Sequence, residues 1–223
     1  MLHRVLGLAS AIERKSVLLL GPRQTGKSSL VAAQLPNARV VDLLDSATYR
    51  ALSARPERLV SIVDTVPAGG IVAIDEIQRV PDLLNEVHRL MERRKDLRFV
   101  LTGSSARKLR RAGVNLLGGR ATRCDLFPLV TSELSAESPT PLRFDRIMQW
   151  GGLPSIILGS QPEADLRDYI ALYVREEIQA EAQIRNLPAF ARFLEAVAGC
   201  NGELLVYANV SRDAEVPVRT VRD

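Results

Sequence analysis

Short apolar runs alternate with amphipathic stretches along the first 130 residues of the chain. Five runs are apolar enough to predict buried strands: 17–20, 38–44, 71–76, 98–106 and 121–126. Between them lie stretches with helical spacing of apolar residues or without helix breakers: 2–13, 27–34, 56–64 and 81–94. Strands that alternate with helices predict an α/β fold with a parallel sheet, whose ligand lies at the carboxyl ends of the strands.

The first apolar run leads into a glycine-bounded loop in the stretch 16–30, SVLLLGPRQTGKSSL. Gly21, Gly26, Lys27 and Ser28 fit the phosphate-loop pattern G-x-x-x-x-G-K-[ST], with the required strand before it and helix after it. Backbone N–H groups of such a loop surround a polyphosphate, and the following helix points its N-terminal dipole at the same oxygens. We therefore expect ATP to be bound by Gly21, Pro22, Arg23, Gln24, Thr25, Gly26, Lys27, Ser28 and Ser29.

Two residues of this loop have specific expected roles. Lys27 should reach the β- and γ-phosphates, and the Ser28 hydroxyl should bind Mg²⁺. The alternative is an ordinary glycine turn that matches the pattern by chance. Four fixed positions with the correct flanking elements argue against that alternative.

The third predicted strand ends in two carboxylates, Asp75 and Glu76. An acid pair at the tip of a buried strand is costly unless it has a task. Binding of Mg²⁺ supplies that task for Asp75, and Glu76 is then free to polarise an attacking water molecule. A strand end that simply emerges into solvent is the alternative. The phosphate loop favours the functional interpretation, because the two motifs together complete one metal and water site.

The fourth predicted strand has a polar tip that lies where a sensor of the γ-phosphate or of the attacking water is expected. Either Thr102 or Ser104 fits that role. The alternative is a plain helix N-cap formed by Ser104 or Ser105.

Arg120 follows Gly118 and Gly119 directly before the fifth predicted strand. An arginine on a glycine-flanked loop is able to neutralise transition-state charge as a finger, either in its own subunit or in a neighbouring one. Action in a neighbour would require a homo-oligomer. A structural ion pair is the alternative interpretation.

Composition adds a modest basic charge to this picture. The chain has 30 Lys and Arg residues and 26 Asp and Glu residues, which gives a net charge of +4. Only four of the basic residues are Lys. Arginine favours bidentate contacts with phosphate, so the balance is compatible with nucleotide or nucleic-acid partners. The densest basic cluster is either a solvated helix face or a nucleic-acid contact, and it comprises Arg107, Lys108, Arg110 and Arg111.

The cysteine pattern and the hydropathy of the sequence indicate the cellular compartment of the protein. Cys124 and Cys200 are far apart and lack C-x-x-C spacing, which predicts free thiols in a reducing compartment and no zinc site. No apolar run approaches the roughly 20 residues that a membrane-spanning helix needs. These patterns predict a cytoplasmic protein with no membrane partner.

The sequence after the core predicts a mainly helical region. We expect an ATPase core over 1–134, a linker and lid-like segment over 135–160, and a helical region over 161–223. Residues 207–221 have the pattern of a helix, a tight turn and a second helix, which predicts a DNA or protein partner through Arg219, Thr220 and Arg222. The chain stops inside this presumed recognition helix, so we expect either a fragment or a short family member.

Five segments together resemble the bacterial and archaeal AAA-type ATPases of the AAA_14 and DUF4143 arrangement. The segments are GPRQTGKSSL, IVAIDEIQRVPDLL, FVLTGSSARKL, LLGGRATRCDLFPLVTSEL and WGGLPSII. The resemblance implies a P-loop NTPase sheet of the ASCE type, in which the sensor strand separates the strands of the phosphate loop and of the acid pair. It also implies that Arg120 faces nucleotide, and that the C-terminal region is an incomplete winged helix.

The motifs predict an Mg²⁺-dependent ATPase that couples its nucleotide state to a conformational change in the C-terminal region. The first alternative is a slow nucleotide-sensing switch that regulates DNA or a protein partner. A P-loop small-molecule kinase is the second alternative. Glu76 directly after Asp75 favours water over a substrate hydroxyl as the nucleophile.

Overall fold

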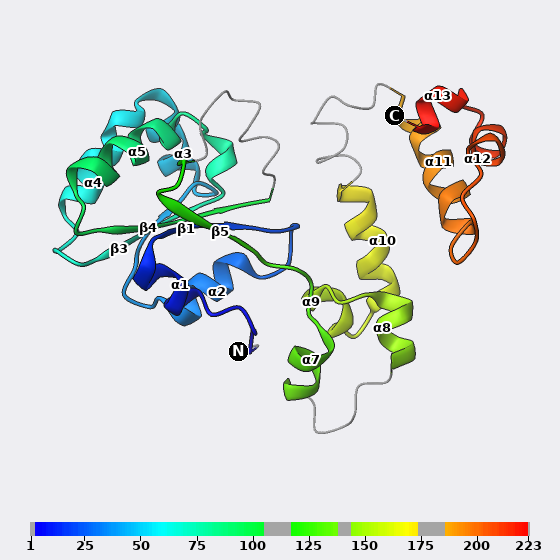
Figure 1. Ribbon diagram of the computed structural model, residues 1–223, viewed down its shortest axis with the longest axis horizontal. Helices are drawn as coiled ribbons and strands as arrows, with labels where there is room; N and C mark the ends of the chain where they lie inside the picture. The colour runs from blue at the N-terminus through cyan, green and yellow to red at the C-terminus, as the bar shows by residue number, and fades with distance from the viewer. Residues whose placement is uncertain (1–2, 105–116, 138–143, 174–185, 223) are drawn as a thin grey trace. The chain divides into compact units, whose positions relative to one another are not determined.

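The computed structural model of the 223-residue chain describes residues 3–104, 117–137, 144–173 and 186–222. The chain divides into two compact units, Met1–Asp165 and Leu166–Asp223 (Figure 1). The helix α10 (Pro162–Tyr173) contains the point of division. The three regions expected from the sequence, with boundaries after residues 134 and 160, stay a prediction.

The first unit is built on a sheet of five strands in the order β2-β3-β4-β1-β5. The strands are β1 (Ser16–Leu20), β2 (Arg39–Asp42), β3 (Ile71–Asp75), β4 (Arg98–Gly103) and β5 (Ala121–Asp125). Every neighbouring pair is parallel. The predicted parallel α/β fold is therefore confirmed, and so is the position of β4 between the strand of the phosphate loop and the strand of the acid pair.

Helices cover both faces of this sheet, which explains why its central strands are continuous apolar runs. The helices α1 (Leu8–Arg14) and α2 (Lys27–Gln34) lie on one face (Figure 1). The helices α3 (Ser46–Ala54), α4 (Leu59–Asp64) and α5 (Leu83–Arg93) lie on the other. The side chains of β1 alternate accordingly, because Val17 and Leu19 pack with α1 and α2 while Leu18 and Leu20 join the opposite core.

The helix expected over residues 2–13 begins only at Leu8. The described residues before it are not helical, and two of them, Arg4 and Val5, donate hydrogen bonds to Glu133, 128 or more residues away in sequence. This end of the chain therefore makes long-range contacts that the helical pattern did not predict.

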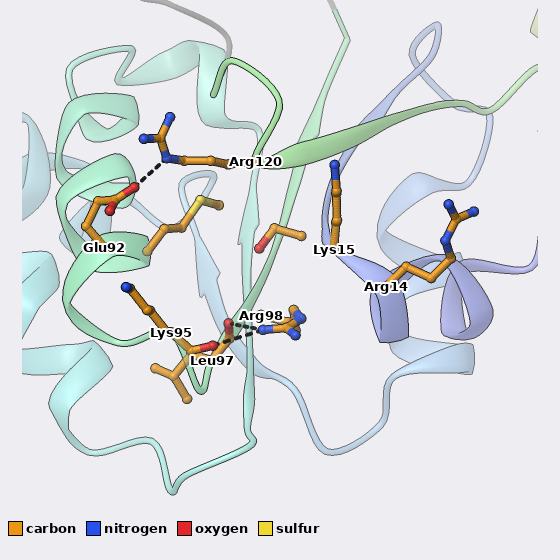
Figure 2. Close-up of a pocket in the computed structure, with 9 residues that line it drawn as sticks. Arg14, Lys15, Glu92, Lys95, Leu97, Arg98 and Arg120 are labelled. Carbon is orange, nitrogen blue, oxygen red and sulfur yellow. Dashed lines mark hydrogen bonds and ion pairs between the residues drawn. The ribbon is translucent and has the colours of Figure 1, made fainter.

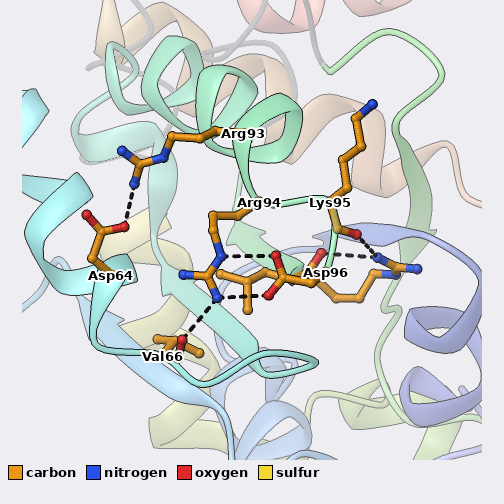
Figure 3. Close-up of polar contacts among 8 residues, drawn as sticks. Asp64, Val66, Arg93, Arg94, Lys95 and Asp96 are labelled. Carbon is orange, nitrogen blue, oxygen red and sulfur yellow. Dashed lines mark hydrogen bonds and ion pairs between the residues drawn. The ribbon is translucent and has the colours of Figure 1, made fainter.

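Ion pairs hold the turn between α5 and β4 in place (Figure 3). Arg94 Nε and Nη2 lie 3.0 and 2.8 Å from the two carboxylate oxygens of Asp96, and Nη2 also donates to the Val66 carbonyl at 3.1 Å. Arg93 pairs with Asp64 on α4. These contacts link the turn before β4 to α4 and to the Val66 carbonyl.

Short helices complete the first unit after β5. They are α7 (Thr131–Glu137), α8 (Phe144–Trp150) and α9 (Pro154–Ile157), and they share a small core of Leu129, Leu134 and Ile157. Gly152 accepts a hydrogen bond of 2.7 Å from the Leu129 N–H. A Cβ atom on Gly152 would lie 2.4 Å from the Leu129 carbonyl oxygen, so this close approach requires glycine.

The second unit is helical, as predicted. Its further helices are α11 (Leu187–Gly199), α12 (Tyr207–Ala214) and α13 (Val218–Arg222). The backbone turns between α12 and α13 at Glu215, with φ of 54°, so the expected order of helix, tight turn and helix is present. Of the helices in the described parts of the chain, none has both the length and the apolar composition to cross a membrane.

Candidate functional site

The candidate site starts at the loop between β1 and α2. A Cβ atom on Gly21 would lie 2.1 Å from the Leu126 carbonyl oxygen, so only glycine fits where the loop leaves the sheet. Gly26 has a φ of 88°, a left-handed conformation that glycine adopts without strain, and it directly precedes α2. Both glycines of the sequence motif therefore have a steric reason in this structure.

Lys27 folds back over this loop. Its Nζ donates hydrogen bonds of 2.9 Å to the carbonyl oxygens of Gly21 and Pro22. The residue is only 5% exposed. The ammonium group therefore lies inside the curve of the loop, where a phosphate group would meet it.

The two predicted metal ligands come together from separate elements. Ser28, in the first turn of α2, donates a hydrogen bond of 2.6 Å to Asp75 Oδ2 at the end of β3. A hydroxyl and a carboxylate oxygen are hard donors of the kind that Mg²⁺ prefers, with water and substrate phosphates as its remaining ligands. The residues present therefore fit a bound Mg²⁺ ion.

Thr102 and Ser104, the two sensor candidates, have different surroundings. Thr102 is 1% exposed, its hydroxyl donates to Asp75 Oδ1, and it accepts a hydrogen bond of 3.0 Å from the Glu76 N–H. Thr102 is thus occupied in supporting the acid pair. Ser104 is only half-buried and lies at the end of β4.

Glu76 has an unusual backbone conformation and a partner that sequence analysis missed. Its φ of 59° is left-handed, which is uncommon for a residue other than glycine and is often found at active sites. The Gln78 side-chain amide donates to Glu76 Oε2 and, at 3.0 Å, to Ser104 Oγ. The only sequence signal for Gln78 is a polar residue two positions after the acid pair.

A second missed residue, Arg4, holds the loop from outside. Its Nη1 donates to the Thr25 carbonyl and its Nη2 to the Phe127 carbonyl, both at 2.6 Å, while Nε lies 3.0 Å from Glu133 Oε1. The side chains of Arg4 and Glu133 are 6% and 4% exposed. This buried ion pair therefore ties the phosphate loop to the segment that follows β5.

The charge of Glu133 is stabilised despite its burial. Burial raises the pKa of the Glu133 carboxyl, but hydrogen bonds from the Val5 and Val130 N–H groups and from Arg4 outweigh it and hold that pKa below its ordinary value. Glu133 is therefore ionised at neutral pH and needs its cationic partner.

The segment before α10 also contacts the phosphate loop. Ser155, in α9, donates a hydrogen bond of 2.9 Å to the side-chain oxygen of Gln24. Gln24 itself has a left-handed φ of 63°. The lid-like segment expected from the sequence therefore reaches a residue of the loop.

Arg120 lies at the amino ends of the parallel strands, whereas the phosphate loop lies at their carboxyl ends. Ser16 pairs with Ala121 at the amino ends of β1 and β5, whereas Leu20 pairs with Asp125 at the carboxyl ends. At about 3.3 Å per residue, the length of β1 separates the amino and carboxyl ends of the strands by roughly 16 Å. One side chain does not span that distance, so this placement argues against the alternative that Arg120 acts on the nucleotide of its own subunit.

Arg120 instead borders a basic cavity (Figure 2). The cavity has a volume of about 290 Å³ and is lined by Arg14, Lys15, Ser16, Met91, Glu92, Lys95, Leu97, Arg98 and Arg120. Arg120 Nε lies 2.5 Å from Glu92 Oε1, and this hydrogen bond holds the pKa of the Glu92 carboxyl below its usual value. Both side chains are about half exposed, at 43% and 54%. The predicted basic cluster around Arg107 lies outside the described residues.

Comparison with protein families identifies two matches along the chain. Residues 13–135 match the family model AAA_14, described as an AAA domain. Residues 142–223 match DUF8612, a domain of unknown function. The expected AAA_14 resemblance is thus confirmed, whereas the C-terminal match is to DUF8612 and not to DUF4143.

Similar curated proteins are the uncharacterized proteins Rv2008c of Mycobacterium tuberculosis and Mb2031c of Mycobacterium bovis. Each is 29% identical over 226 residues, a match that covers 96% of this chain and 48% of the relative. The chain therefore spans about half the length of the curated relatives it matches.

Two solved structures are also similar, at low identity. One is the STAND protein PH0952 from Pyrococcus horikoshii, with a tetratricopeptide repeat sensor, at 19% identity and a TM-score of 0.49 over 88% of this chain and 35% of that chain. The other is the RuvB Holliday junction branch migration motor of Thermotoga maritima, at 14% identity and a TM-score of 0.43 over 96% and 82%. Both TM-scores are below 0.5, so we draw nothing further from these likenesses.

Proposed function

The chain belongs to the AAA_14 family of AAA domains, and on that premise we propose that it binds ATP with Mg²⁺ and hydrolyses it. The observation that carries this proposal is the hydrogen bond of 2.6 Å between Ser28 and Asp75. It joins the phosphate-loop motif to the acid-pair motif, which lie 47 residues apart in sequence, in one site.

Each residue of the site has a distinct task in this proposal. Lys27 would face the β- and γ-phosphates, while Ser28 and Asp75 would hold the metal ion. When bound, Mg²⁺ neutralises charge on the phosphate oxygens. Glu76 orients the attacking water and accepts its proton, and Ser104 contacts the γ-phosphate or the water. Ser104 is the better sensor candidate because the Thr102 hydroxyl is engaged by the acid pair.

Hydrolysis is coupled, in our proposal, to the C-terminal effector region through the lid-like segment. The support is the contact between Ser155 and Gln24, since Gln24 belongs to the loop that surrounds the phosphates. A change in the loop on nucleotide binding would alter this hydrogen bond and shift α9. The helix–turn–helix of α12 and α13 would then present Arg219 and Arg222 to DNA or to a protein partner.

Arg120 acts, we propose, on the nucleotide of a neighbouring subunit. It lies at the amino ends of the strands, opposite the phosphate loop. A neighbouring subunit stacked against these amino ends would bring its own loop toward Arg120. Such a head-to-tail contact generates a ring or an open filament. The basic lining of the cavity around Arg120 favours the approach of phosphate charge.

A nucleotide-sensing switch with little turnover is the second candidate. The helix–turn–helix order of α12 and α13 favours it, because that order is typical of proteins that regulate DNA. The two candidates predict the same binding but different rates.

Steady-state phosphate release from MgATP, with and without duplex DNA, separates them. We expect turnover by the wild type, and a loss of about 10²-fold or more in Glu76→Gln with unchanged ATP affinity. Binding without turnover under both conditions would favour the switch. Equal rates for Glu76→Gln and the wild type would show that water activation lies elsewhere.

Mixing two inactive variants tests the role of Arg120. Arg120→Ala should bind ATP and lose hydrolysis by about 10³-fold or more. In mixtures with Glu76→Gln, some interfaces pair an intact Arg120 with an intact Glu76, so activity should return. Mixtures that stay inactive at concentrations where the subunits associate would contradict action in trans.

A further inference from the structure

Gln78 bridges the acid pair and the end of the sensor strand. It belongs to the single 3-10 turn Ile77–Arg79 that follows β3. Its amide nitrogen donates to Glu76 Oε2 and to Ser104 Oγ, the latter at 3.0 Å. One carboxamide therefore connects two candidate site residues from different strands, and neither motif includes it.

The orientation of this carboxamide is determined by its neighbours. If the nitrogen and oxygen were exchanged, a carbonyl oxygen would face the Glu76 carboxylate, and two acceptors would repel each other. The nitrogen must therefore face Glu76, which directs Oε1 toward the backbone of Gly103. A Cβ atom on Gly103 would lie 2.8 Å from Oε1, so this glycine leaves the space that the carboxamide occupies.

The carbonyl side of this carboxamide is buried. Among the described residues, no donor is hydrogen-bonded to the buried Gln78 Oε1. A buried acceptor without a donor is destabilising and rare in folded proteins, and such departures concentrate at functional sites. Within the described part of the chain, the Gln78 carboxamide is therefore held through its nitrogen.

We propose that Gln78 is a positioning residue that couples Ser104 to the catalytic carboxylate of Glu76. Because Ser104 accepts a hydrogen bond from Gln78, its own hydroxyl proton is available to a phosphate oxygen or to water. Gln78 engages Glu76 Oε2, so Oε1 is oriented to accept the proton of the attacking water. This inference rests on the proposed function, in which Glu76 activates water.

A chain of hydrogen bonds of this kind is polarised along its length. When a phosphate accepts a hydrogen bond from the Ser104 hydroxyl, Ser104 Oγ becomes a better acceptor for the Gln78 amide. The hydrogen bond from Gln78 to Glu76 then changes in strength. Through these hydrogen bonds, the presence of the terminal phosphate therefore affects the Glu76 carboxylate. A purely space-filling Gln78 would have no such effect.

The test uses Gln78→Met, which keeps a side chain of similar length and removes both hydrogen bonds. We expect kcat to fall by about 10²-fold, the scale of a misplaced reacting group, while the Kd for MgATP stays within about twofold. Binding of ADP with aluminium fluoride, a mimic of the transferring phosphoryl group, should weaken in parallel with kcat. Arg79→Met, in the same turn and on an exposed side chain, is the matched control and should change neither quantity.

A second arm distinguishes positioning from a general loss of structure. In a Glu76→Gln background, Gln78→Met should lower kcat no further, because the group it positions is already gone. Additive losses, equal weakening of ATP and of the fluoride complex, or a rate equal to wild type would each overturn the inference. A wild type without turnover would refute the proposed function instead, and the fluoride complex would still test Gln78: weakening by Gln78→Met supports its role, and unchanged binding overturns it.

Discussion

Arg4 offers the sharpest test of how the phosphate loop is supported. Arg4→Met preserves much of the apolar stem and removes three hydrogen bonds, to Thr25, Phe127 and Glu133. It also leaves the Glu133 carboxylate, 4% exposed, without its cation. We expect a large loss of stability, because a buried charge without its partner is strongly unfavourable.

The magnitude follows from the burial of the pair. Removing one partner of a buried ion pair costs about 3–5 kcal/mol. Two backbone N–H groups continue to donate to Glu133, so we expect the lower end of that range, about 3 kcal/mol. For a protein of this size, that loss lowers Tm by about 6–12 °C.

Urea unfolding at pH 7 measures the effect, with Arg93→Met as the control. The Arg93 pair with Asp64 is 50% exposed on both sides, so its loss should cost less than about 1 kcal/mol. Adding Glu133→Gln to Arg4→Met should restore part of the stability, since it removes the unpaired charge. Equal losses for Arg4→Met and Arg93→Met, or no recovery in the double variant, would show that the buried Arg4–Glu133 pair does not stabilise the protein in this way.

Three further outcomes are expected. Gly21→Ala should abolish binding of a fluorescent ATP analogue, because its Cβ would lie 2.1 Å from the Leu126 carbonyl oxygen; retained affinity would contradict this. Asp75→Asn should raise the Mg²⁺ concentration needed for half-maximal hydrolysis, and an unchanged Mg²⁺ titration would remove Asp75 from the metal site. The folded-state pKa of Glu133 is lowered, so its ionisation stabilises the protein above the ordinary value of 4.5, and this stabilisation is lost as pH falls through the lowered pKa. The stability advantage of wild type over Glu133→Gln in urea should shrink over that range, and a constant difference would argue against a stabilising role of the Glu133 charge.

The fold and the centre of the site were predictable because each has a local signal. Strands covered by helices on both faces must be apolar throughout, so β1, β3 and β4 are visible as runs. The phosphate loop and the acid pair are recognisable because phosphate and Mg²⁺ chemistry requires particular residues at particular spacings. The sheet order that unites them was inferred from family resemblance.

The supporting residues were not predictable, because their roles depend on contacts distant in sequence. Arg4 meets Glu133 at a separation of 129 residues, and no periodicity marks either one. Gln78 acquires its role only when the sheet order brings the end of β4 beside it. The position of Arg120 at the amino ends of the strands was predictable in principle. A residue that precedes a parallel strand lies at its amino end, away from the phosphate loop.

Calorimetric titration of MgATP tests whether the loop from Gly21 to Gly26 binds the triphosphate. We expect saturable binding to the wild type and its loss in Lys27→Ala, because the substitution removes the ammonium group held inside the loop. Equal ATP affinity of the two proteins would contradict the assignment of this loop as the nucleotide site.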